Sequence, residues 1–186
     1  MRYAGGIAAL SARRYDALHL LLATPVQANQ AMSGSGEKPI VLPVLTAITE
    51  TGGAFKLLPG RERDHVPRRE HLFLHLHPSL DSALFLGRSY EPLFDRFELL
   101  LVLTFVDLRD PAGGGDVWAP PGRFSWKHRH SESPMALLIA EATEQGNRWL
   151  PLANGFFGGN SDRLLKVANS YKQLLSPRPV VTRAPG

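Results

Sequence analysis

The sequence from Glu91 to Leu108, EPLFDRFELLLVLTFVDL, sets the class of fold that we expect for this chain. Its apolar side chains recur at the i, i+3, i+4, i+7 spacing of one helical face. From Leu99 to Val106 only Thr104 is polar, so the helix should be central and packed on more than one side. The core should then include Phe94, Phe97, Leu101 and Phe105.

The rest of the chain predicts a mainly α-helical single domain over residues 1–175, with five to six helices around the long helix at about 91–108. Breaks and caps are expected at Pro25, Pro78, Ser133-Pro134, Gly146 and Asn160-Ser161. Two aromatic and glycine-rich ordered loops, at 117–126 and around Phe156-Phe157, should fold against the helices. Residues 176–186 contain three prolines in a basic segment, which predicts a disordered tail.

The apolar spacing and the prolines also predict where several other helices begin and end. The apolar spacing from Tyr3 to Leu22 predicts one amino-terminal helix, and residues 41–50 also suit a helix. Pro78 should separate a helix that begins near Arg68 from a short one over residues 79–86.

The amino-terminal helix is apolar from its first turn and has no polar cap. Either the chain is the carboxy-terminal part of a larger protein, or this helix is simply buried.

The composition is that of a globular bacterial protein. Hydrophobic residues make up 44% of the 186 residues and charged residues 20%, the net charge is +4, and there is no cysteine. The absence of cysteine excludes disulfides and thiolate metal sites, and no apolar run approaches the roughly 20 residues that cross a bilayer. Arginine is far more frequent than lysine, as in GC-rich bacterial genomes. We therefore expect a cytoplasmic protein that does not associate with membranes.

Four of the seven histidines lie between His65 and His77. Within this stretch, Arg69 is followed by five residues and then His75, which is similar to the motif of HEPN ribonucleases. The resemblance covers this motif alone. It implies a helical RNA-cleaving or nucleic-acid-binding domain in which Arg69 holds the scissile phosphate and His75 assists cleavage of the RNA backbone. The alternative is an amphipathic helix whose charged and histidine side chains face solvent.

Two metal sites can be considered. His71 and His75 are spaced i, i+4 on one helical face, and His77 could complete a metal site. The residues between His71 and His75 are apolar, so the general base of a zinc protease is missing. Glu91, Asp95 and Glu98 lie on one face of the long helix and could bind a divalent ion. A solvated stripe of ion pairs with the nearby arginines is the interpretation that we favour.

A third candidate site is the basic and aromatic stretch that contains Arg123, Trp126, Lys127 and Arg129. Such residues can stack on exposed bases and contact phosphates, which predicts nucleic-acid binding. They also suit a packed loop whose aromatic rings are buried while the cations reach water.

No phosphate-binding loop, dinucleotide fingerprint or nucleophile elbow occurs in the sequence, and we expect no cofactor. The leading hypothesis is a non-catalytic helical interaction or regulatory module of a bacterial cytoplasmic protein. Its expected partner is another protein or an upstream domain of the same polypeptide. RNA cleavage by Arg69 and His75 is the first alternative, and a histidine metal site is the second.

Overall fold

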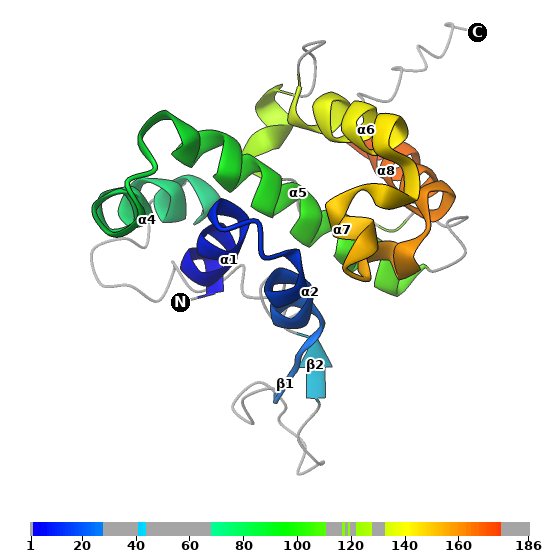
Figure 1. Cartoon of the computed structure of the whole chain (residues 1–186), viewed down its shortest axis with the longest axis horizontal. Helices are drawn as coiled ribbons and strands as arrows, with labels where there is room; N and C mark the ends of the chain where they lie inside the picture. The colour runs from blue at the N-terminus through cyan, green and yellow to red at the C-terminus, as the bar shows by residue number, and fades with distance from the viewer. Residues whose placement is uncertain are drawn as a thin grey trace, which may run out of the picture.

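The computed structural model describes residues 2–27, 41–43, 68–110, 117, 119, 122–127 and 133–175. These residues form a single, mainly helical domain, as the sequence predicts (Figure 1). The α-helices are α1 (Arg2–Ser11), α2 (Tyr15–Ala23), α4 (Arg68–Leu84), α5 (Tyr90–Arg109), α6 (Pro134–Gln145), α7 (Leu150–Ala153) and α8 (Ser161–Leu175). Short 3-10 helices are η3 (Gly87–Ser89), η4 (Arg123–Lys127), η5 (Gly146–Arg148) and η6 (Phe156–Gly159). Strands β1 (Pro25–Gln27) and β2 (Val41–Pro43) pair in antiparallel fashion.

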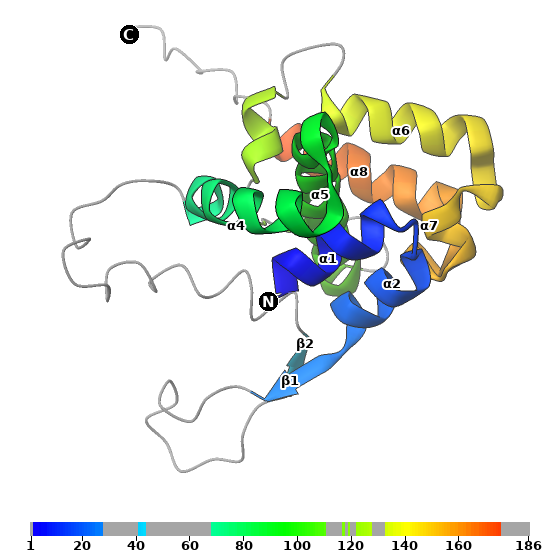
Figure 2. The ribbon, with the colours of Figure 1, turned by 60° about the vertical axis from the view of Figure 1, so that its left-hand side comes forward.

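Helix α5 is the centre of the domain. It contacts α1 and α4 on one side and α6 and α8 on the other, and the two views place it between these groups (Figures 1 and 2). Phe94, Phe97 and Leu101 have no exposed surface, and Phe105 is 6% exposed. The prediction of a central helix buried on several sides is therefore confirmed.

The amino-terminal segment packs into this core as two helices, so the expectation of one helix is wrong. Arg13 adopts a left-handed conformation with φ 55°, and the N–H of Arg14 donates to the carbonyl of Ala9. This hydrogen bond closes the end of α1 and redirects the chain into α2. The side chains that both helices bury are Tyr3, Ile7, Leu10, Tyr15, Leu18 and Leu22.

Two further expectations need correction. Pro78 lies inside α4, which continues through it to Leu84, so the residues around Pro78 form one helix instead of two. Val41–Pro43 pairs with Pro25–Gln27 as a strand, although residues 41–50 suited a helix. Cross-strand backbone hydrogen bonds replace the helical ones in these three residues. Residues 44–50 and the tail at 176–186 lie outside the described residues.

The capping residues in the sequence correctly predicted both ends of α6 and the start of α8. The Ser133 hydroxyl accepts a hydrogen bond from the N–H of Ala136, and Gly146 ends α6 with a positive φ of 55°. The N–H of Arg163 donates to the side-chain oxygen of Asn160 at the start of α8. In the predicted loop at 117–126, the described part includes the buried Phe124 and the start of η4. The loop around Phe156 and Phe157 buries both rings.

Among the described helices, none combines the length and the apolar character that a membrane span requires.

The close contact between α1 and α5 generates a prediction. A Cβ at Gly6 would lie 2.0 Å from the Phe97 ring, whereas a Cβ at the neighbouring Gly5 would lie 3.9 Å from Leu21. Because alanine favours helix over glycine, Gly5→Ala should raise the free energy of unfolding by up to about 1 kcal/mol. Gly6→Ala should lower it by roughly 1–3 kcal/mol, because the rigid core must move away from the methyl group.

Urea unfolding of the two variants measures this difference. The expected result is a change of opposite sign at adjacent positions of one helix. Equal stabilisation by both substitutions would show that α1 does not lie this close to α5.

Candidate binding groove and its buried charge cluster

The amino-terminal half of α5 carries Glu91, Asp95 and Glu98 on one side, as their spacing requires. The side chain of Asp95 is 3% exposed and that of Glu98 is fully buried. The expectation of a solvated stripe of ion pairs is therefore wrong for Asp95 and Glu98, whereas Glu91 stays 46% exposed. The cations that neutralise these carboxylates come from α4 and η4, because enclosure of α5 removes Asp95 and Glu98 from water.

Arg123 joins three elements. Its Nε donates to Glu70 of α4 and its Nη1 donates to Glu91 of α5, each over 2.8 Å. The guanidinium also lies 3.8 Å from the centre of the Phe73 ring, which adds a cation–π contact with α4. The first residue of η4 thus holds the start of α4 against α5.

Lys127, at the end of η4, is shared by two carboxylates. Its Nζ donates to Oε1 of Glu91 and to Oδ2 of Asp95, each over 2.5 Å. The other oxygen of Asp95, Oδ1, is buried and has no hydrogen-bond partner. Only one of the two Asp95 oxygens is therefore satisfied within the described residues.

Glu98 is held at the junction of α1, α4, α5 and η4. The backbone N–H of Arg123 donates to its Oε2 over 2.5 Å, and the Tyr3 hydroxyl donates to its Oε1 over 3.5 Å. Nη1 of Arg69 lies 3.6 Å from the same Oε1. A Cβ at Gly122 would lie 2.6 Å from the carboxylate, so glycine allows the backbone of η4 to reach it.

These groups form what we call the charge cluster: Glu70, Glu91, Asp95, Glu98, Arg69, Arg123 and Lys127. When all seven described groups are ionised, the four carboxylates and three cations leave one excess negative charge. An uncompensated charge in a buried site favours uptake of a proton or binding of a cation.

The pKa values follow this arrangement. Burial raises the pKa of Glu98 to about 7, and the charge of Asp95 adds to the increase, although Arg69 and the N–H of Arg123 oppose it. Burial also raises the pKa of Asp95, against the effect of Lys127. Hydrogen bonds from Lys127 and Arg123 lower the pKa of Glu91, which is closer to solvent, to about 2.

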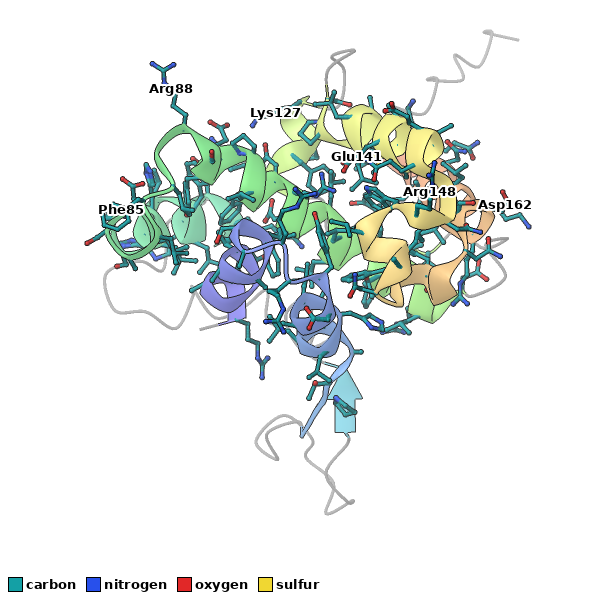
Figure 3. All side chains as sticks on the ribbon, in the orientation of Figure 1. Phe85, Arg88, Lys127, Glu141, Arg148 and Asp162 are labelled. Atoms are coloured by element: carbon teal, nitrogen blue, oxygen red, sulfur yellow. The ribbon has the colours of Figure 1, made fainter. Side chains whose placement is uncertain are left out.

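A groove of about 830 Å³ borders the cluster between α5, η4 and the start of α6. Glu91, Asp95 and Lys127 belong to both the groove and the cluster. The remaining lining residues are Arg88, Ser89, Pro92, Leu93, Arg96, Leu99, Pro134, Leu137 and Leu138. Figure 3 shows Arg88 projecting outward from the ribbon near one end of α5. The groove therefore has mainly apolar walls and a charged floor, which is the usual character of a ligand site.

Arg69 and His75 differ sharply in their surroundings. The side chain of Arg69 is 12% exposed and faces Glu98, whereas His75 is exposed. Six residues along a helix correspond to a rotation of about 240°, so the two side chains leave α4 in different directions. Arg69 has a structural ion-pair partner in Glu98, and RNA cleavage by this pair stays a prediction.

The histidines of α4 make ring contacts. The ring centres of His71 and His75 lie 3.8 Å apart, and the ring of His77 stacks on Tyr90 at 4.3 Å. His71 is half-buried and His75 is exposed, as expected for side chains near the surface. Within the described ranges, no group of three or more histidine, aspartate or glutamate side chains is arranged to hold a metal ion.

The basic segment at 123–129 is only partly described. Arg123 and Lys127 direct their donors to Glu70, Glu91 and Asp95 of the same chain. The side chain of Trp126 and all of Arg129 lie outside the described residues. Contact of this segment with nucleic acid stays a prediction.

Sequence reasoning identified the acidic face of α5 but not its partners. The contact of Tyr3 with Glu98 and the pairings of Glu70 with Arg123 and of Arg69 with Glu98 were missed, because these contacts join residues that are distant in the sequence. The sequence did contain one signal for a buried charge cluster. Charged residues are dense from Glu91 to Glu98, directly beside a strongly apolar run.

Comparisons of this chain with protein-family models, curated proteins and solved structures found no match.

The raised pKa of Glu98 predicts how stability depends on pH. Its folded value of about 7 exceeds its ordinary value of 4.5, so its contribution is fully present below 4.5 and is lost as the pH rises through 7. Between about pH 5 and about pH 8 the free energy of unfolding should fall by up to about 3 kcal/mol from this group. The lowered pKa of Glu91 has the opposite effect on stability, but this effect changes only between pH 4.5 and about pH 2.

Urea unfolding of the wild type and of Glu98→Gln at both pH values tests this assignment. The wild type should lose stability with rising pH, and Glu98→Gln should lose most of this dependence because position 98 no longer titrates. The same pH dependence in both proteins would exclude Glu98 as the titrating group.

Proposed function

We propose that this domain is a non-catalytic interaction or regulatory module of a bacterial cytoplasmic protein. In this proposal the groove between α5, η4 and α6 binds a segment of a partner protein or of another domain of the same polypeptide. The single observation that carries the proposal is the groove itself, whose surface is mainly apolar and borders the charge cluster. The composition and the lack of cysteine support the cytoplasmic assignment.

The walls of the groove suit an apolar protein segment. Leu137 is 57% exposed on α6, and the adjacent Leu138 is buried at 2%. Pro134 and Leu93 extend the apolar surface to α6 and α5. Burial of such side chains is the main favourable contribution to most protein associations.

The charge cluster fits a structural role better than a catalytic one. Glu98 is fully buried, and its carboxylate is held by Tyr3, Arg69 and the backbone N–H of Arg123. Arg123 and Lys127 likewise hold α4 and η4 against α5. A general acid or base must instead reach a substrate within hydrogen-bond distance. Binding in the neighbouring groove requires no such reaction.

Selection from a displayed peptide library tests the proposal. Peptides that bind the folded domain should carry apolar residues and should bind Leu137→Asp at least about tenfold more weakly, because the charge disrupts an apolar contact. Leu20→Asp is the matched control, since Leu20 is 69% exposed on α2 and does not line the groove. It should leave binding unchanged.

Two results would contradict the proposal. One is that selected peptides bind Leu137→Asp as tightly as the wild type. The other is that the purified protein cleaves RNA and loses this activity in folded Arg69→Ala and His75→Ala variants. The second result would establish the nuclease alternative.

A further inference from the structure

We infer that the segment bound in the groove is acidic and amphipathic, and that it places an aspartate or glutamate carboxylate on Arg88 and apolar side chains along the rest of the groove. This inference rests on the proposed function and specifies the chemistry of the partner. It also predicts where the acidic residue of the partner lies, because Arg88 belongs to η3, directly before the first turn of α5.

The first argument is that Arg88 has no ionic partner of its own. Arg88 lines the groove and is exposed, and among the described residues it forms no ion pair or side-chain hydrogen bond. The other two cations of the lining are paired, Arg96 with Glu141 and Lys127 with two carboxylates of α5. Arg88 is therefore the lining cation that remains available to a carboxylate of the partner.

The second argument is the charge of the lining. It contains three cations, Arg88, Arg96 and Lys127, and two carboxylates, Glu91 and Asp95, which leaves one excess positive charge. An acidic partner compensates this excess, whereas a basic partner increases it. The whole chain has a net charge of +4, which also attracts an acidic partner over a longer distance.

Most of the negative charge near the groove is enclosed. The side chain of Asp95 is 3% exposed and that of Glu98 is fully buried, and burial raises the pKa of both carboxyls. Protonation of Glu98, whose pKa is about 7, removes the excess negative charge of the charge cluster. Glu91 reaches solvent, but Arg123 and Lys127 both donate to it. The charge that the groove presents to a partner is therefore mainly positive.

The third argument is the length and the apolar character of the groove beyond Arg88. From Arg88 to Leu99 the lining follows the start of α5 for about three turns, or roughly 16 Å. An extended segment of about five residues spans this length, and its alternate side chains point to one face. Leu93 and Leu137 supply apolar surface to that face. An acidic residue at one end of the segment and apolar residues at alternate positions after it match this lining.

Three pentapeptides isolate the contribution of the carboxylate. All are acetylated and amidated, and a first residue that is glutamate, glutamine or lysine is followed by serine, leucine, serine and leucine. The reversed sequences are tested as well, because the groove does not fix the direction of the segment. Titration of the isotope-labelled protein, followed by amide chemical shifts, should place the glutamate peptide on residues of the groove.

The expected order of affinity is glutamate, then glutamine, then lysine. At low salt the glutamate peptide should bind about two- to fivefold more tightly than the glutamine peptide, the ratio expected for an exposed ion pair. Salt at about 0.5 M should remove most of this difference, because it screens exposed charges.

Matched substitutions assign the effect to Arg88. Arg88→Gln should abolish the preference for glutamate over glutamine, and Arg88→Glu should make the lysine peptide bind more tightly than the glutamate peptide. Arg148→Gln is the control, since Arg148 is an exposed arginine of η5 that does not line the groove. Figure 3 shows the two arginines far apart. The control should keep the preference of the wild type.

The outcomes separate this inference from the proposed function. Equal binding of the glutamate and glutamine peptides in the groove, or tighter binding of the lysine peptide, would overturn the inference and leave the proposed function intact. A glutamate preference that survives in Arg88→Gln would also overturn it, because another group would then bind the carboxylate. Absence of shifts at the groove with every peptide would overturn the inference, and the library selection would then judge the proposed function separately.

Discussion

The enclosure of α5 is the constraint on which the rest of this structure depends. From Phe97 to Asp107 every residue of α5 is buried, and three acidic residues of the helix, Asp95, Glu98 and Asp107, are buried with its apolar side chains. Each of these residues, Asp95, Glu98 and Asp107, is met by a cation from a different element: Lys127 of η4, Arg69 of α4 and Arg163 of α8. Removal of one partner from a buried pair is strongly destabilising, so these contacts specify where the surrounding elements dock.

The same constraint explains why the candidate site lies where it does. The groove opens where η4 and the start of α6 approach α5, so its floor is the edge of the charge cluster. Structural ion pairs hold Glu91 through Oε1 and Asp95 through Oδ2. Apolar walls beside this floor explain why we favour a protein segment over a small polar ligand.

The sequence predicted those features that depend on local chemistry. The apolar run in α5 predicted a central helix, and Ser133 with Pro134 predicted the start of α6. Pro78 misled, because a helix can tolerate a proline when neighbouring contacts support both of its halves. The sequence showed that α5 has an acidic face, but it did not show that most of this face is buried. Its partners, such as Arg123, lie 25 or more positions away from Glu98, and no periodicity encodes a pairing over that distance.

The central claim is that Glu98 and Glu91, two carboxylates on one helix, have very different environments because one is enclosed and the other reaches solvent. The most direct measurement is a pH titration of the side-chain carboxyl carbons by NMR. Our account predicts that Glu98 titrates near 7 and Glu91 near 2. Titration of both carboxyls near their ordinary value of 4.5 would contradict it, because neither the burial of Glu98 nor the ion pairs of Glu91 would then exist as described.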